Sequence, residues 1–178
     1  MTHLWHDIKA GDKVPSKINI VIEIPMGSKC KYELSRTTGS IRVDRILATA
    51  MTYPQNYGFV PQTLCEDGDP LDALLLSQVP IFPGTFIKAR PIGIVHMIDQ
   101  KQKDDKLICV ATEDPKFADY NDIKDLPKQT LKEIEEFFRF YKRLEGKKTK
   151  VKGHSGKIKA FSLIKKYVAA YNKKFKKK

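Results

Sequence analysis

Ile18-Asn-Ile-Val-Ile-Glu-Ile24 is a nearly continuous apolar run that stops at Pro25 and is typical of a β-strand. Further strand patterns follow between turn residues, at 31–35, 41–47, 73–76, 86–95 and 106–111. Within the segment 86–95, Pro91 and Gly93 predict a bulge or an edge. Short strands at this spacing favour a small barrel.

Two helices are expected after these strands. Pro127 begins the first, which Gly146 closes and whose apolar residues recur at helical spacing at Leu131, Ile134, Phe138, Tyr141 and Leu144. Ser155 is expected to cap the second, whose apolar face comprises Ile158, Phe161, Ile164, Val168 and Tyr171. Both faces have the width of a core contact, so we expect both helices to dock on the barrel. The class is α+β with a mainly β core, in a single domain over residues 1–178.

Composition and cysteine usage indicate a cytoplasmic protein with an ordinary core. The chain has 178 residues, of which 41% are hydrophobic, and no window has the apolar length that spans a bilayer. Residues 1–7 lack the charged-then-apolar pattern of a secretory signal. Cys30, Cys65 and Cys109 are odd in number and widely spaced, which predicts free thiols in a reducing compartment.

The net charge of +12 belongs to the C-terminal fifth of the chain. Residues 142–178 hold 15 of the 33 Lys and Arg but one of the 21 acids, Glu145, so they carry +14 and residues 1–141 carry −2. Such a segment could contact nucleic acid or anionic lipid. We favour a solvated helical face with a frayed lysine end at about 173–178.

The stretch Cys65-Glu66-Asp67-Gly68-Asp69-Pro70-Leu71-Asp72 sets three aspartates and a glutamate within seven residues. Its Gly and Pro predict a stiff turn in which like charges stay close, and such charges raise one another's pKa or recruit a cation. Hard divalent cations prefer oxygen ligands, and Mg²⁺ combines one or two carboxylates with water and substrate phosphates. The loop is therefore interpreted as a Mg²⁺ site that acts on phosphate.

Three other structures could also account for this loop. A solvated Asp-Gly-Asp-Pro turn between apolar runs is about as common. An EF-hand is excluded, because a count from Asp67 puts Asp72 at the required glycine and Gln78 at the closing glutamate. An aspartate-nucleophile phosphatase would need a buried apolar strand before the loop, and residues 63–66 make a poor one.

Several further charged and phenolic residues interrupt segments that otherwise form the core. Lys31 and Glu33 share one face of a strand, because strand side chains alternate. The others are Glu23, Asp44-Arg45, Tyr53, Tyr57, Asp99, Asp104 and Lys106, with Tyr53-Pro-Gln-Asn-Tyr57-Gly expected as a turn. Singly, each is more often a solvated or structural residue. Together they supply acids for metals and bases for phosphate.

The chain closely resembles the family I soluble inorganic pyrophosphatases of bacterial type, over about residues 14–170. The matching motifs, in order, are Glu23-Ile-Pro, Lys31-Tyr-Glu33, Val43-Asp-Arg45, Tyr53-Pro-Gln-Asn-Tyr57-Gly, Asp67-Gly-Asp-Pro-Leu-Asp72, Arg90-Pro-Ile-Gly93 and Tyr141-Lys142. The resemblance implies a five-stranded OB-like β-barrel flanked by two main α-helices. It also implies Mg²⁺-dependent hydrolysis of diphosphate to two orthophosphates.

The resemblance assigns roles to individual residues. Asp67, Asp72 and Asp104 resemble the ligands of the activating metals, Asp99 a ligand of the metal that arrives with substrate, and Glu23 and Glu33 outer members of the acidic site. Asp69 matches the general base for the attacking water, which becomes hydroxide between two metals. The phosphate contacts are matched by Lys31, Arg45, Tyr57, Lys106, Tyr141 and Lys142, with the last two expected on the Pro127 helix.

The family also implies a homo-hexamer. Glu136 and Phe140 stand where some hexameric relatives carry histidines, so contacts between trimers would differ here. A rival interpretation is an inactive barrel that binds nucleic acid through its lysines. Single-strand binders need aromatic platforms on a basic groove, whereas Tyr53 and Tyr57 are grouped with acids. The sequence therefore favours diphosphate over nucleic acid as the partner.

Overall fold

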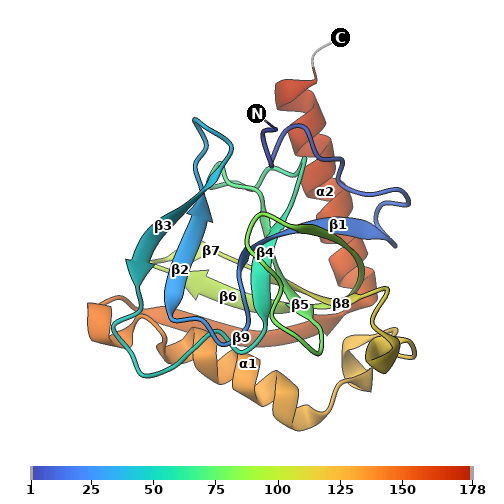
Figure 1. Cartoon of the computed structure of the whole chain (residues 1–178). Coiled ribbons are helices and arrows are strands. Elements are labelled where there is room, and N and C mark those ends of the chain that lie inside the picture. The colour runs from blue at the N-terminus through green and yellow to red at the C-terminus, as the bar shows by residue number, and fades with distance from the viewer. Residues whose placement is uncertain (1, 177–178) are drawn as a thin grey trace.

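Five strands close into a ring in the computed structural model, which describes residues 2–176 (Figure 1). The order is β1 (Ile18–Ile24), β4 (Asn56–Val60), β5 (Leu71–Leu76), β8 (Lys106–Ala111) and β6 (Phe86–Asp99), and pairing of β6 with β1 completes the circle. Within the ring only β5 and β8 run parallel. The barrel predicted from the strand spacing is therefore confirmed.

Three shorter additions surround the ring. The strands β2 (Cys30–Leu34) and β3 (Ile41–Ile46) form a separate two-stranded sheet beside it (Figure 1). The far end of β6 also pairs with β7 (Gln102–Lys103) and with β9 (Thr149–Gly156). The register of β6 against β8 shifts between Pro91 and Gly93, which confirms the predicted bulge.

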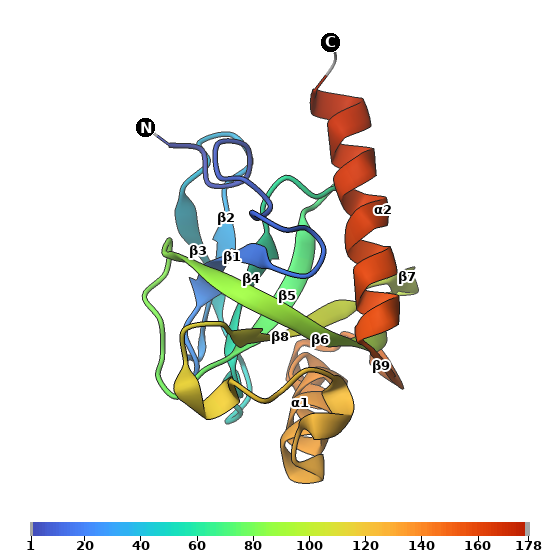
Figure 2. The ribbon, with the colours of Figure 1, turned by 90° about the vertical axis from the view of Figure 1, so that its right-hand side faces the viewer.

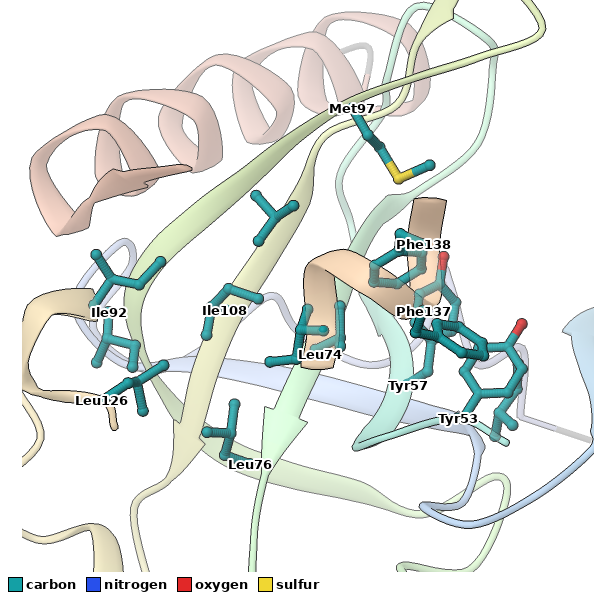
Figure 3. Close-up of a cluster of buried hydrophobic side chains, with 14 of the residues drawn as sticks. Tyr53, Tyr57, Leu74, Leu76, Ile92, Met97, Ile108, Leu126, Phe137 and Phe138 are labelled. Carbon is teal, nitrogen blue, oxygen red and sulfur yellow. The ribbon is translucent and has the colours of Figure 1, made fainter. Parts of the chain in front are cut away.

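The helices α1 (Lys128–Phe140) and α2 (Lys157–Phe175) cover different parts of the barrel (Figure 2). Helix α1 inserts Ile134, Phe137 and Phe138 into a cluster that also contains Leu74 and Ile108 of the barrel (Figure 3). Helix α2 packs on a second cluster of buried hydrophobic side chains, to which it contributes Ala160, Leu163, Ile164 and Tyr167. Short 3₁₀ turns connect the elements at Pro115–Phe117, Ile123–Asp125 and Arg143–Glu145. No helix within residues 2–176 is long and apolar enough to cross a membrane.

Strand β4 corrects the interpretation of 53–57 as a turn. Asn56 and Tyr57 begin this strand, and the chain approaches β1 so closely that a Cβ on Gly58 would lie 1.9 Å from the Val21 carbonyl oxygen. Tyr53 precedes the strand and is itself buried. Turn-forming residue types were therefore overridden by the tight packing of two barrel strands.

Strand β9 was also missed, because lysines and glycines dominate its sequence. Its Ser155 is not a helix cap: the hydroxyl lies 2.8 Å from His96 Nε2 on β6, and Gly156 precedes the helix instead. The buried face of α2 is rotated from the predicted one, since Ile158 is 70% exposed. Strand β9 pairs with β6 as far as Gly156, and α2 therefore begins at the next residue, Lys157.

Two other helix predictions need correction. Helix α1 ends at Phe140, so Tyr141 and Lys142 lie just beyond it and Leu144 is exposed. Helix α2 continues to Phe175, whose ring centroid lies 5.6 Å from that of Trp5. Residues 173–175 are thus helical rather than frayed, and Lys176 Nζ donates to Gln62 Oε1 at 3.0 Å. Lys177 and Lys178 lie outside the described residues.

Candidate active site

A cleft of about 330 Å³ lies between the β2–β3 sheet, one end of the barrel and the residues after α1. It gathers residues from six separate segments of the chain. Twelve of the thirteen predicted site residues line it: Glu23, Lys31, Glu33, Tyr57, Asp67, Asp69, Asp72, Asp99, Asp104, Lys106, Tyr141 and Lys142.

Lys106 lies at the centre of this arrangement. Strands β5 and β8 run parallel with Ala73 beside Leu107, so Asp72 and Lys106 stand at the same end of the two strands. The Lys106 ammonium contacts the carboxylates of Asp72 and Asp104 and lies 5.7 Å from the Tyr57 ring centroid. Burial opposes its charge, but the two carboxylates outweigh burial and raise the pKa of Lys106 above its usual range.

A second ion pair joins Lys142 to Asp99. The Lys142 ammonium contacts Asp99 Oδ2, whereas Asp99 Oδ1 is buried without a hydrogen-bond partner among the described residues. Tyr141 packs between this pair and the core, with its ring centroid 5.2 Å from Lys142 Nζ. Burial raises the pKa of the Tyr141 phenol well above its usual value, so the hydroxyl remains a donor.

Glu23 joins the barrel to the β2–β3 sheet. Its side chain is buried, and its Oε1 accepts a hydrogen bond of 2.7 Å from the Leu34 amide. Burial, followed by repulsion from Asp72, raises the pKa of Glu23 to about 8. This carboxyl group is one of seven that line the cleft.

The prediction that Lys31 and Glu33 share a strand face is confirmed. Lys31 Nζ lies 3.2 Å from Glu33 Oε2 and 2.8 Å from Asp44 Oδ2 on β3. Burial lowers the pKa of Lys31, but Asp44 and then Glu33 reverse this effect and raise it. The ammonium therefore stays charged while it is partly shielded from water.

Arg45 is the predicted site residue that does not line the cleft. Its Nε donates to Glu145 Oε1 at 3.0 Å, and its Nη1 contacts Asp44. Its Nη2 is buried and has no hydrogen-bond partner among the described residues. The Arg45 guanidinium is thus positioned by Glu145 and Asp44, and its Nη2 donor is unused.

The acidic loop, Asp67–Asp72, is a tight turn braced by its own backbone. The Cys65 amide donates to the Asp69 carbonyl at 2.8 Å, and the Asp69 amide donates to Asp67 Oδ1 at 3.0 Å. Glu66, just before the loop, does not line the cleft and is bonded to Lys166 and Tyr167 of α2. Of the four clustered acids, three therefore face the cleft and one faces the helix.

Sequence reasoning missed three charged residues at or next to this site. Arg36, from the turn after β2, forms an ion pair with Asp69 and lines the cleft together with Lys103. Glu145 anchors Arg45 from 100 positions away. The sequence contained one indication that Glu145 has a specific role, because it is the only acid among the basic residues 142–178.

The donor set suits hard divalent cations. Seven carboxylates line the cleft, no thiol or imidazole does, and Asp99 Oδ1 is a buried acceptor without a partner. Within residues 2–176 no three acidic, His or Cys side chains stand close enough to hold an ion as they lie. In this arrangement the carboxylates contact ammonium groups instead, Asp72 and Asp104 that of Lys106 and Asp99 that of Lys142.

Comparison with known proteins connects this geometry to an activity. A family model described as inorganic pyrophosphatase matches residues 20–172. A soluble inorganic pyrophosphatase from Solanum tuberosum is 56% identical over 145 residues, which cover 82% of this chain and 69% of that protein. A second, from Chlamydomonas reinhardtii, is 47% identical over 98% of this chain and 91% of its own length.

The fold agrees with the sequence match. The crystal structure of inorganic pyrophosphatase from Thermus thermophilus superposes with a TM-score of 0.93 at 41% identity, and the match covers 96% of this chain and 99% of that one. The OB-like barrel with two main helices is thereby confirmed. On sequence, fold and the convergence of acids and bases on one cleft, the chain belongs to the inorganic pyrophosphatase family of diphosphate hydrolases.

Proposed function

We propose that the chain hydrolyses inorganic diphosphate to two orthophosphates with Mg²⁺ as its activating ion. One observation carries this proposal: seven carboxylates and five cationic side chains line a single cleft of about 330 Å³. Carboxylates alone would repel a diphosphate, and cations alone would bind it without activating water. Both are needed to hold metal ions and a multiply charged anion together.

The metal-holding residues in this proposal are Asp67, Asp72 and Asp104, with Asp99 reserved for the ion that accompanies substrate. The support is chemical, because all four present hard oxygen donors and Asp99 retains an unused one. Bound divalent ions would lower the pKa of water and screen the charge of the phosphates. Glu23 and Glu33 are proposed as outer members that bond to water around the site.

Phosphate is proposed to be held by Lys31, Arg45, Tyr57, Lys106, Tyr141 and Lys142. Arg45 has a buried Nη2 with no partner, which an incoming phosphate oxygen would satisfy. Lys106 and Lys142 act in two ways, since they neutralise Asp72, Asp104 and Asp99 and can donate to phosphate oxygens. The Tyr57 and Tyr141 hydroxyls stay protonated and can donate as well.

Asp69 is proposed to take the proton from the attacking water. The water oxygen bonds to one phosphorus atom while the bridging P–O bond breaks, and the bridging oxygen leaves with the second phosphate. Arg36 pairs with Asp69 and so holds that carboxylate at the side of the cleft. Lys31 and Arg45 stabilise the charge that gathers on the phosphate oxygens as the bond breaks.

The direct test measures phosphate release from diphosphate. Chelation of divalent ions should abolish turnover and added Mg²⁺ should restore it. Turnover that survives exhaustive chelation would contradict the metal assignment, while absence of turnover at any metal concentration would contradict the activity itself.

Two further properties are proposed. We place the protein in the cytoplasm, because its three cysteines are free thiols. We also infer a homo-oligomer, with a hexamer as the expected form. Sedimentation would test it: a purely monomeric chain at micromolar concentration would contradict the assembly.

A further inference from the structure

A polar network next to the cleft links β6, β7 and β9 to the residue that follows Asp104. The Ser155 hydroxyl on β9 lies 2.8 Å from His96 Nε2 on β6. His96 Nδ1 lies 3.1 Å from Asp105 Oδ2, and Lys103 Nζ of β7 lies 3.1 Å from the same oxygen. Strands β7 and β9 both pair with β6 (Figure 2), so side chains from three strands converge on one carboxylate.

Asp105 is the buried member of this network. Its side chain is 4% exposed, whereas those of His96 and Lys103 are 32% and 60% exposed. Its Oδ2 has no aligned hydrogen-bond partner within residues 2–176, so nearby charges and dipoles hold the carboxylate. A buried carboxylate destabilises a fold unless such groups face it. Lys103 lies mostly in water, which screens its charge, so His96 is the more firmly placed partner.

The orientation of the His96 ring follows from its two neighbours. Nδ1 faces a carboxylate oxygen and therefore carries a proton, because two acceptors would repel each other. In the neutral ring, Nε2 then accepts from the Ser155 hydroxyl. The approach to Asp105 is attractive in the neutral and in the protonated ring. His96 is thus a bridge between β9 and the Asp105 carboxylate.

This bridge lies between two of the carboxylates proposed to hold metal ions. Asp99 follows His96 by three residues on β6, and Asp104 directly precedes Asp105. Asp99 and Asp104 line the cleft, whereas His96 and Asp105 do not. The contact between His96 and Asp105 therefore connects the two chain segments that present Asp99 and Asp104 to the cleft.

Few other contacts fix these segments to each other. Strand β7 has two residues, and residues 100–103 are exposed. The Asp104 amide donates to the Met97 carbonyl at 3.0 Å, which places the backbone but leaves rotation of the following side chains free. A pairing this short is a weak brace. The buried contact of Asp105 with His96 is the additional support on the side away from the cleft.

We propose that His96 is a positioning residue for the metal-holding carboxylates, and that it acts through Asp105 to fix Asp104 relative to Asp99. The inference rests on the proposed function, because it takes Asp99 and Asp104 as metal-holding residues. Ligands bind an ion more tightly when neighbouring groups fix their geometry. The effect of His96 is therefore expected in Mg²⁺ affinity, and saturating Mg²⁺ should restore kcat.

Two substitutions separate the two contacts of the ring. Asn carries its amide nitrogen near the position of Nδ1, and Gln carries its amide nitrogen near that of Nε2. His96→Asn therefore keeps the contact with Asp105, whereas His96→Gln keeps only that with Ser155. The control is His154→Gln, which removes a contact of equal length, 3.1 Å, between a histidine and Glu135 away from the cleft.

Calorimetric titration with Mg²⁺ in the absence of diphosphate gives the first readout. His96→Gln and Asp105→Asn should each bind Mg²⁺ about tenfold more weakly, while His96→Asn and the control should stay within about twofold of the unmodified chain. The double variant should bind no more weakly than Asp105→Asn alone, because His96 acts through that carboxylate. Asp105→Asn provides the same test should His96→Gln not fold.

Phosphate release gives the second readout. The Mg²⁺ concentration for half-maximal rate should rise about tenfold in His96→Gln, with kcat at saturating Mg²⁺ within about twofold of the unmodified chain. A merely structural role would not produce this pattern, because added Mg²⁺ does not repair a damaged cleft.

Three results would overturn the positioning role. Unchanged Mg²⁺ affinity in His96→Gln and Asp105→Asn would show that the contact does not matter to the site. An equal loss in His96→Asn would assign the effect to Ser155 or to the ring, and a kcat that stays low at saturating Mg²⁺ would show that the effect is not confined to ion binding. Failure of the proposed function would look different, because the unmodified chain itself would then bind no Mg²⁺ or release no phosphate.

Discussion

The Tyr167 hydroxyl donates a hydrogen bond of 2.7 Å to Oε2 of Glu66, 101 positions earlier in the chain. Oε1 of the same carboxylate contacts the Lys166 ammonium, and the Leu64 amide donates to the Tyr167 carbonyl at 3.0 Å. Helix α2 therefore supports the segment that leads into the acidic loop, although it contributes no residue to the cleft itself.

The two partners of Glu66 should contribute differently to the free energy of unfolding. Tyr167 is buried, so Tyr167→Phe should lower the free energy of unfolding by about 1 kcal/mol, the typical value of one hydrogen bond. Lys166→Gln removes an exposed ion pair and should cost at most about 0.5 kcal/mol. Urea denaturation of both variants measures the difference. A larger cost for Lys166→Gln would show that charge, rather than the buried hydroxyl, holds the loop.

Asp72→Asn should lower kcat by at least about 100-fold, because a neutral amide is a weaker ligand and a weaker partner of Lys106. Calorimetric titration should also show weaker binding of Mg²⁺. Asp119→Asn, at an exposed position away from the cleft, serves as the matched control. Near-normal turnover in Asp72→Asn would contradict the proposed role of this residue in holding a metal ion.

Arg45→Ala should separate phosphate binding from metal binding. Loss of a buried guanidinium donor at about 2 kcal/mol predicts a fall in kcat/KM of about 30-fold. Affinity for Mg²⁺ in the absence of diphosphate should stay within about twofold, because a cation does not ligate a cation. The control is Arg139→Ala, an exposed arginine on α1 that does not line the cleft. A large loss of Mg²⁺ affinity in Arg45→Ala would mean that Arg45 mainly holds the acidic residues in place.

His6 should make stability depend on pH. Burial, followed by the neighbouring His3, lowers the pKa of His6 from the usual 6.5, while Asp7 acts weakly in the other direction. The unfolded chain therefore binds the proton more readily, so stability is complete above pH 6.5 and falls as pH decreases toward the lowered pKa. His6 Nδ1 lies 2.6 Å from the Tyr171 hydroxyl, so the contact with α2 is the part that weakens.

Denaturation of the unmodified chain and His6→Gln between about pH 7.5 and about pH 5.5 checks this expectation. The unmodified chain should lose stability relative to the variant as the pH falls. A difference that stays constant across the range would exclude His6 as the source.

A chain that ends after Asn172 should keep its activity within about twofold, since no residue of the cleft is removed. It should lose about 1 kcal/mol of stability, because Phe175, although 43% exposed, packs its ring on Trp5 and His6. A chain that ends after Phe175 is the control and should match the full length. Thermal denaturation distinguishes them, and equal midpoints would show that Phe175 contributes nothing.

The sequence predicted well what depends on local patterns. The apolar run 18–24 coincides with β1, and the segment 106–111 coincides with β8. The family resemblance assigned roles to twelve residues that the fold brings to one cleft. Prediction from local sequence failed where pairing between strands overrides local preference. Strands β4 and β9 are examples, because their turn formers, glycines and lysines are poor strand signals.

Contacts between distant residues could not be predicted either. Glu66 with Tyr167, and Arg45 with Glu145, are side-chain pairs about a hundred positions apart. The apolar positions of α2 are compatible with two faces, one centred on Ile158 and one on Tyr167. Only docking against the barrel selects the face that contains Tyr167, because Tyr167 then reaches Glu66.

The parallel pairing of β5 with β8 has a consequence for folding. Asp72 and Lys106 meet because the two strands align Ala73 with Leu107. A slip of one residue would turn every side chain of β5 to its other face and bring Leu71 or Ala73 to the position of Asp72. Such a barrel could still be collapsed and rich in sheet, yet its charged centre would be missing. Activity regained on refolding therefore counts chains in the correct register, which circular dichroism alone does not distinguish from chains that are merely collapsed.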